Sequence, residues 1–325
     1  MSPKLASVVL STLAALAVAT LAPARSSPLA PQPVQLVASD RLTTLEVWPA
    51  TGALPGTPSP TVIIIPGWNS GASLYTEVAK YLTGRGYVVA IFGHGDNSAV
   101  VADEWAGWTE TAINLLVAQN ATPSSPVFHE IDTTRLALVG HSLGGAVATQ
   151  VTALDPRIKV LAIEGPNASD ATFLDLAALI SVPILAMDGS LDLVAPAAAC
   201  SDVVLARAVS VAKGSIVVQG GCHTNCPADY DLNYIFAPGQ WVLQPSPVWP
   251  YATWTYTFPT IPGVTPIPGP LQRAIAFPYL GGWLDRFLAG KKDTVGWTDG
   301  RKADAELLSG TLWEEYFSAG ARWNP

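Results

Sequence analysis

Short apolar runs alternate with helical patterns over most of residues 61–220, and this alternation restricts the fold more than any other feature of the sequence. The apolar runs read TVIIIPGW, YVVAIFG, RLALVG, KVLAIEG, VPILAMDG and GSIVVQGG. Continuous apolar runs of this length are typical of strands buried on both faces. Strands separated by helices form βαβ units, so the sequence predicts an α/β fold with a mostly parallel central sheet and helices on both faces.

The other segments divide the chain around this predicted domain. We expect a signal peptide at 1–24, a flexible leader at 25–32, one α/β domain at 33–291 and a C-terminal extension at 292–325, with a short helical pattern around 303–318. Residues 227–268 are rich in proline and aromatic residues and have no clean period. They predict an insertion in the domain, which is a lid, an apolar acyl-binding wall or a long loop packed on the domain.

The N-terminus has the layout of a secretory signal peptide. Lys4 precedes an apolar run from Leu5 to about Leu21, and Ala22-Pro23-Ala24 provides a small-x-small cleavage pattern. The alternative is an N-terminal membrane anchor, but the run is about as short as a spanning helix can be. We therefore expect a secreted protein, extracellular or periplasmic, with no stable membrane insertion after cleavage.

The charge balance limits the partners. The net charge is −8 and only 13% of the residues are charged, so the chain lacks the basic surface that nucleic-acid binding needs. The sequence contains no pattern of metal ligands, and we expect neither a metal nor another cofactor. We also expect a monomer.

A serine lies between two glycines where a predicted strand meets a predicted helix. The stretch is Gly140-His141-Ser142-Leu143-Gly144, a G-x-S-x-G motif that follows LALV. In this context the motif forms a tight turn that exposes the serine hydroxyl at the carboxyl end of the sheet, in front of a helix N-terminus. Ser142 is therefore predicted to be a nucleophile.

A serine nucleophile needs a base and an acid that orients the base, in the chain order Ser, acid, His. His223 is the only histidine after Ser142, and it follows a strand and two glycines. Asp192 lies just past a predicted strand, in a G-x-x-D-x-x-x-P turn, and is the favoured acid. Glu164 ends the preceding strand and is its main rival, whereas Asp188 is expected to point into turn structure.

The oxyanion of the tetrahedral intermediate needs backbone N–H donors. One donor is expected from Leu143, which follows the nucleophile, and the other from Trp68, in the loop after the first long strand. Among the other histidines, His94 either lines the cleft or lies in a solvated loop, and His129 is expected at the loop surface.

These motifs together resemble one branch of the α/β-hydrolases. VIIIPGWNSGASLYTEVAKYLTGRGYVVA, GHSLGG and GSLDLVAP are similar to segments of dienelactone hydrolases, cutinases and polyester hydrolases, with chlorophyllases close by, over about residues 60–226. The resemblance implies a carboxylic-ester hydrolase with an acyl-enzyme intermediate. It also implies that Trp68 donates an oxyanion N–H and that its ring forms one wall of the substrate cleft.

Two residues depart from the polyester hydrolases. Asn167 stands where these enzymes usually place a tryptophan, so one half of an aromatic clamp is missing. His141 stands before the serine, as in many lipases, where polyester hydrolases usually have tryptophan; its place in the turn also suits packing or hydrogen bonding. We predict that Trp68, His141 and Asn167 bind the substrate.

Three cysteines lie near the predicted acid and base. A bond from Cys200 to Cys222 or Cys226 would join the acid loop to the base loop, and a local Cys222–Cys226 bond is the alternative. Asn120 and Asn167 each begin a glycosylation sequon.

The predicted function is hydrolysis of apolar carboxylic esters by Ser142, Asp192 and His223. A serine peptidase or amidase on the same fold is the first alternative, because it would share these three residues. A non-catalytic binding protein that kept the fold is the second.

Overall fold

A computed structural model describes residues 32–54, 56–95, 102–167, 171–223, 234–237, 240–243, 255–256, 264–293 and 295–318. The predicted signal peptide, the leader up to residue 31 and Cys226 lie outside the described residues, as does most of the predicted insertion. Within the insertion, the three short strands β9 (Tyr234–Ala237), β10 (Gln240–Leu243) and β11 (Thr255–Tyr256) pair in an antiparallel sheet.

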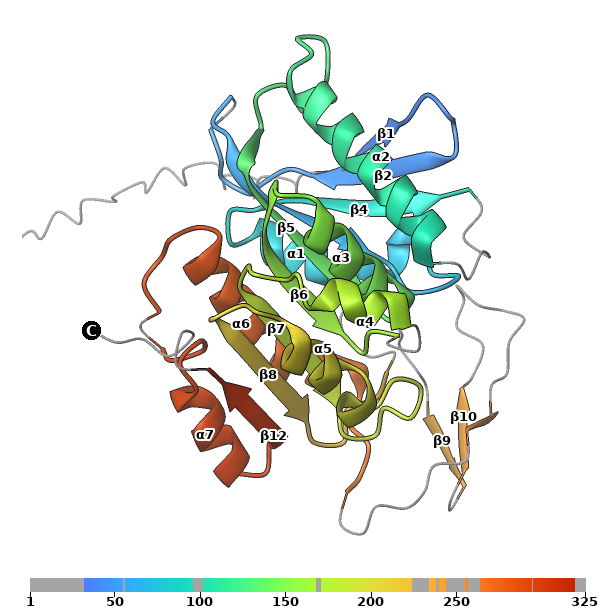
Figure 1. Cartoon of the computed structure of the whole chain (residues 1–325), viewed down its shortest axis with the longest axis vertical. Helices are drawn as coiled ribbons and strands as arrows, with labels where there is room; N and C mark the ends of the chain where they lie inside the picture. The colour runs from blue at the N-terminus through green and yellow to red at the C-terminus, as the bar shows by residue number, and fades with distance from the viewer. Residues whose placement is uncertain are drawn as a thin grey trace, which may run out of the picture. The chain divides into compact units, whose positions relative to one another are not determined.

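In the part of the chain that the structure describes, nine strands form the main sheet in the order β1-β2-β4-β3-β5-β6-β7-β8-β12 (Figure 1). The strands are β1 (Val34–Val37), β2 (Thr43–Trp48), β3 (Ser59–Ile65), β4 (Val88–His94), β5 (Ile131–His141), β6 (Ile158–Glu164), β7 (Ile184–Gly189), β8 (Lys213–Val218) and β12 (Leu312–Phe317). All pairs from β4 to β8 are parallel, and the outer pairs β1–β2, β2–β4 and β8–β12 are antiparallel. The predicted α/β fold with a mostly parallel sheet is confirmed.

Helices cover both faces of this sheet. They are α1 (Thr76–Thr83), α2 (Ala102–Asn120), α3 (Leu143–Leu154), α4 (Ala171–Ala177), α5 (Ser201–Arg207), α6 (Gly269–Phe287) and α7 (Arg301–Leu308), with short 3₁₀ turns η1 (Ala72–Tyr75) and η2 (Ala197–Ala199). Figure 1 shows α2 to α5 on the viewer's side of the sheet. Ile63 and Ile65 of β3 share a core with these helices, whereas Val62 and Ile64 share the opposite core with α1 and α6. Both faces of the strand are thus buried, which explains its continuous apolar sequence.

The predicted C-terminal extension contributes to the main sheet. The helical pattern expected around 303–318 ends at α7, and residues 312–317 instead form β12, which pairs with β8. Gly310 has a φ of +72°, a left-handed conformation that ends the helix at low steric cost. The helix expected over 312–318 was therefore wrong, because pairing with β8 decides the conformation of this segment.

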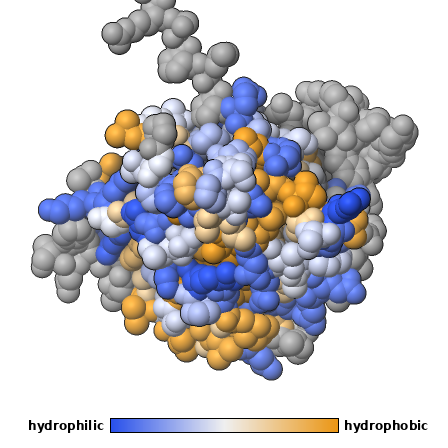
Figure 2. Space-filling view, turned by 90° about the horizontal axis from the view of Figure 1, so that it is seen from above, coloured by the Kyte–Doolittle hydropathy of each residue, from blue (hydrophilic) through white to orange (hydrophobic). Residues whose placement is uncertain are grey.

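Among the described helices, none has both the length and the apolar character that crossing a bilayer requires. The face of the molecule seen in Figure 2 mixes hydrophilic and hydrophobic residues, with a larger hydrophobic area at the lower edge of the view.

Candidate active site

Ser142 occupies a strained turn between β5 and α3. Its φ is +56° and its ψ is −123°, values that non-glycine residues rarely adopt. Hydrogen bonds hold the turn on both sides: the Ser142 N–H donates to the carbonyl of Glu164 at 2.9 Å, and its carbonyl accepts from Gly145 and Asn167 at 2.9 and 3.1 Å. This is the geometry of a nucleophile elbow, which holds the hydroxyl out from the end of the sheet.

The two glycines of the motif allow close backbone contact. A Cβ atom on Gly140 would lie 2.2 Å from the carbonyl oxygen of Gly144. A Cβ atom on Gly144 would lie 2.2 Å from the carbonyl oxygen of Ile65 and 2.3 Å from that of Pro66. The absence of a side chain at these positions therefore lets the elbow pack against the end of β3.

We expect Gly144→Ala to destabilise the protein by about 3 kcal/mol or more, because the methyl group can be placed only by moving backbone. Urea unfolding of the variant and of the parent protein measures this difference. Gly107→Ala is the matched control: Gly107 lies within α2 with no atom near its missing Cβ, so alanine should stabilise the protein by about 0.5–1 kcal/mol. Equal stability of Gly144→Ala and the parent protein would contradict the close contact.

Asp192, His223 and Ser142 form a continuous hydrogen-bonded chain, although they come from three separate loops. His223 Nδ1 lies 2.7 Å from Asp192 Oδ2, and His223 Nε2 lies 2.9 Å from Ser142 Oγ. The side chains of His223 and Asp192 are 10% and 1% exposed. The three residues predicted from the motif, the turn after the strand and the chain order therefore meet at hydrogen-bonding distance at the carboxyl edge of the sheet.

Asp192 is held as a carboxylate. Burial by itself would raise the pKa of Asp192, but the hydrogen bond and charge of His223 and the backbone N–H groups of Ala195 and Val194 outweigh it and lower the pKa. These two N–H groups donate to Oδ1 at 2.8 and 2.9 Å, which leaves Oδ2 for His223. An ionised acceptor at this position keeps the proton of the imidazole on Nδ1 and leaves Nε2 to accept from Ser142.

The loops that carry Asp192 and His223 are hydrogen-bonded directly to each other. The Leu191 N–H donates to the carbonyl of Gly221 at 2.8 Å, and the Gly220 N–H donates to Ser190 Oγ at 2.9 Å. Gln272 of α6 also holds the loop of His223, since its side-chain amide bonds both the N–H and the carbonyl of Cys222, at 2.9 and 3.0 Å. These hydrogen bonds fix the backbone that leads into His223.

The two rival acids have other partners. Asp188 is buried at the end of β7, where its Oδ1 accepts from the Ser201 hydroxyl at 2.8 Å and from the Gly165 N–H at 3.2 Å. Glu164 is also buried, and its backbone carbonyl supports the turn of Ser142. Of the three candidate carboxylates, Asp192 is the one that bonds His223.

The raised pKa of Asp188 predicts how the stability of the folded protein changes with pH. Burial raises this pKa from 3.8 to about 8, with the nearby charge of Asp192 adding to the effect against the hydrogen bond from Ser201. The folded protein therefore keeps a proton that the unfolded chain loses above about pH 4, so the contribution of this carboxyl to stability falls as pH rises from about 4 to about 8. Asp188→Asn cannot titrate. We expect its Tm relative to the parent protein to rise steadily over this pH range in thermal unfolding, and a constant difference would contradict the buried, protonated carboxyl.

The predicted oxyanion donors lie in the two segments that flank Ser142. Leu143 is the first residue of α3, and Trp68 follows Gly67 in the turn after β3. A Cβ atom on Gly67 would lie only 3.2 Å from the Cβ of Ser142, so this turn packs directly against Ser142. Both segments therefore lie beside Ser142, and donation of their backbone N–H groups to an oxyanion stays a prediction.

The three predicted substrate-binding residues differ in exposure. Trp68 is 47% exposed and Asn167 is exposed, whereas His141 is only 3% exposed. Both ring nitrogens of His141 lie within hydrogen-bonding distance of protein groups: Nδ1 is 2.9 Å from the Tyr75 hydroxyl, and Nε2 is 2.8 Å from the carbonyl oxygen of His223. The packing alternative for His141 thus accounts for its contacts, and substrate binding by Trp68 and Asn167 stays a prediction.

Three further residues near the triad were not predicted from sequence. Leu193 and Val194 directly follow Asp192 and are 41% and 56% exposed, so they add apolar surface beside the predicted acid. Tyr75 is fully buried, and nothing in the local sequence distinguishes it from an ordinary core tyrosine.

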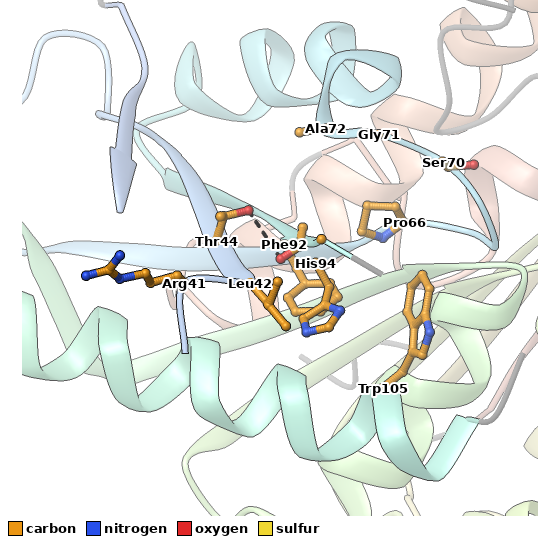
Figure 3. A pocket seen from close by; sticks show the side chains of 12 residues that line it. Arg41, Leu42, Thr44, Pro66, Ser70, Gly71, Ala72, Phe92, His94 and Trp105 are labelled. Carbon is orange, nitrogen blue, oxygen red and sulfur yellow. Dashed lines mark hydrogen bonds between the residues drawn. The ribbon is translucent and has the colours of Figure 1, made fainter. Parts of the chain in front are cut away.

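A cavity of about 280 Å³ borders the turn that carries Trp68 (Figure 3). Its walls include Phe92, His94, Trp105, Pro66 and Arg41, and none of Ser142, Asp192 and His223 lines it. His94 also stacks on Trp108, with ring centroids 3.6 Å apart. His94 is therefore separate from the hydrogen-bonded chain of the triad.

Cys200 and Cys222 are both buried. Cys226 lies outside the described residues, so the disulfide stays a prediction with its alternatives open. The described residues include no cluster of histidine, cysteine and acidic side chains that could hold a metal ion.

One family comparison agrees with this architecture. The model of the family described as "PETase: PET hydrolase-like" matches residues 43–233, which is more than half of the chain and includes every residue discussed as a triad or oxyanion candidate. A comparison with curated proteins gave no match.

Proposed function

Because the chain belongs to the PET hydrolase-like family, we propose that it is a secreted serine carboxylic-ester hydrolase acting on apolar esters, as cutinases, lipases and polyester hydrolases do. The observation that carries the proposal is the hydrogen-bonded chain from Asp192 through His223 to Ser142, on a strained turn at the carboxyl edge of the sheet. The apolar N-terminal run, with its small-x-small pattern at Ala22-Pro23-Ala24, supports export.

The reaction follows from the roles of these groups. His223 Nε2 takes the hydroxyl proton as Ser142 Oγ attacks the ester carbonyl, and Asp192 stabilises the resulting imidazolium. Backbone N–H groups of Trp68 and Leu143 bind the oxyanion. The imidazolium then protonates the leaving alcohol, which leaves an acyl-enzyme. Water, deprotonated by His223, attacks the acyl group, and the acid is released as Ser142 regains its proton.

The substrate class follows from the exposed side chains near the triad. Trp68, Leu193 and Val194 present apolar surface, which suits an apolar acyl or alcohol group. Asn167, which stands where polyester hydrolases usually have tryptophan, offers no second aromatic face. We therefore propose that flexible aliphatic esters and polyesters are better substrates than a rigid aromatic polyester.

A substrate series tests the proposal. We expect the purified protein to hydrolyse p-nitrophenyl esters from acetyl to palmitoyl and to erode polycaprolactone faster than amorphous poly(ethylene terephthalate). Faster erosion of the aromatic polyester would contradict the proposed substrate class. Cleavage of p-nitroanilides without cleavage of any ester would contradict the proposal and identify an amidase. Inactivity on both classes of substrate would favour a non-catalytic binding protein.

Trp68→Ala tests the apolar wall. We expect KM for medium-chain p-nitrophenyl esters to rise about tenfold, because the loss of one large apolar contact weakens binding by about 1.5 kcal/mol. The backbone N–H remains, so kcat should change much less. Tyr316→Ala, which removes another exposed aromatic ring from β12, is the control and should leave both parameters unchanged. An unchanged KM in Trp68→Ala would argue against substrate contact by this ring.

A further inference from the structure

The hydroxyl of Tyr75 connects two parts of the proposed active site. It accepts a hydrogen bond from the Gly67 N–H at 2.8 Å, and Gly67 immediately precedes Trp68. It also lies 2.9 Å from Nδ1 of His141, the residue next to Ser142. The turn of Trp68 is thus attached to the nucleophile elbow through one buried phenol, although Tyr75 and His141 are far apart in sequence.

A second hydrogen bond of His141 extends this connection to His223, the proposed base. Its Nε2 lies 2.8 Å from the backbone carbonyl oxygen of His223. A carbonyl oxygen can only accept, so Nε2 carries the ring proton and Nδ1 accepts the proton of the Tyr75 hydroxyl. One arrangement of protons therefore satisfies all three hydrogen bonds, from Gly67 to Tyr75, from Tyr75 to His141 and from His141 to His223.

The charge state of His141 suits this arrangement. Burial and, to a smaller extent, the proximity of His223 together lower the pKa of His141 to about 3, against the hydrogen bond to the His223 carbonyl and the charge of Asp192. The ring is thus neutral where a serine hydrolase works, which Nδ1 requires in order to accept. The contact is also tight, since a Cβ atom on Gly67 would lie 3.1 Å from His141 Nδ1.

We propose that Tyr75 and His141 are positioning residues that set the distances among the oxyanion turn, Ser142 and His223. This inference rests on the proposed function and adds two residues to it. Buried polar groups destabilise a core unless they are bonded, and apolar side chains would fill the same space. These two polar residues lie where the turn, the elbow and the base loop meet. The two outer bonds of the network end on backbone, at the Gly67 N–H before Trp68 and at the carbonyl of His223.

Tyr75→Phe is the direct test, because it keeps the ring and removes only the hydroxyl. The Gly67 N–H and His141 Nδ1 then lose their partner, and the turn of Trp68 is free to shift. We expect kcat for p-nitrophenyl butyrate to fall about ten- to a hundredfold, since a small misplacement of reacting groups has effects of this size. KM should stay within about twofold.

Tyr279→Phe is the matched control. Tyr279 is equally buried, and its hydroxyl bonds Glu306, which belongs to α7. This variant loses a buried tyrosine hydroxyl away from the triad, so its Tm should fall while its kcat stays at the parent value. A loss of kcat of equal size in both variants would overturn the proposal, because it would then report general loosening of the core.

Two substitutions of His141 test the proposal independently. His141→Phe removes the donor to the His223 carbonyl, whereas His141→Gln keeps an amide N–H that can reach it. We expect His141→Gln to retain at least about five times the kcat of His141→Phe. Equal loss in the two His141 variants would contradict the proposed bond to His223.

The rate of phosphorylation of Ser142 by diethyl p-nitrophenyl phosphate separates this proposal from the proposed function. If the parent protein hydrolyses no ester and is not labelled, the proposed function fails regardless of Tyr75. If the parent protein is active and Tyr75→Phe has the same kcat and the same labelling rate, only the positioning role fails. A slower labelling rate in folded Tyr75→Phe, with an unchanged rate in Tyr279→Phe, is the result that we expect.

Discussion

Ser142→Ala is expected to lower kcat for p-nitrophenyl esters by about a thousandfold or more while the protein stays folded. The hydroxyl is the only group removed, and a serine hydrolase without its nucleophile retains only the contribution of the oxyanion donors and of substrate binding. Because alanine replaces serine at the same positive φ, the strain of the turn is the same in both proteins. The measurement is kcat and KM for p-nitrophenyl butyrate, together with thermal unfolding.

Ser210→Ala is the control for this substitution. Ser210 is buried in the loop before β8, at the amino end of that strand and so away from the carboxyl edge that carries Ser142, and its hydroxyl bonds the carbonyl of Ala212. Its removal should lower Tm without changing kcat. If Ser142→Ala kept kcat within about tenfold of the parent protein, another group would have to be the nucleophile.

Asp192→Asn is expected to lower kcat by about a thousand- to ten-thousandfold. The backbone N–H groups of Val194 and Ala195 require an acceptor, so the amide oxygen of the asparagine would face them. Its NH₂ group would then face Nδ1 of His223 and favour the tautomer with the proton on Nε2. In this tautomer His223 cannot accept the proton of Ser142.

The two rival carboxylates provide the controls for Asp192. Asp188→Asn and Glu164→Gln change buried acids of the same region that do not bond His223 through their side chains. Each should change kcat by less than about tenfold. A larger loss in either control than in Asp192→Asn would assign the acid to the other residue.

The main features of the fold could be predicted from sequence because they depend on local patterns. The continuous apolar run of β3 reflects burial on both faces, and the glycines around Ser142 reflect contacts within a short turn. His223 could be selected because no other histidine follows Ser142 in the chain. The turn motif after β7 favoured Asp192 as the acid, and in the structure the Asp192 carboxylate forms the hydrogen bond to His223.

The features that sequence did not predict depend on contacts between distant segments. Residues 312–317 form a strand because β8 offers an unpaired edge, and this outweighs a local pattern that favoured a helix. Tyr75 contacts Gly67 and His141 through tertiary packing, and the periodicity of its own segment contains no sign of this. The direction in which the ring of His141 points is likewise set by its partners and not by the motif.

The most direct test of the central claim is to identify the residue that reacts with diethyl p-nitrophenyl phosphate. The purified protein is inhibited with this reagent, its intact mass is measured, and the modified peptide is located by mass spectrometry. The account predicts a single diethylphosphoryl group per chain, bound to Ser142, with loss of esterase activity in proportion to labelling and no labelling of Ser142→Ala. Esterase activity that persists when Ser142 is fully labelled, or inhibition that follows labelling of another residue, would contradict it.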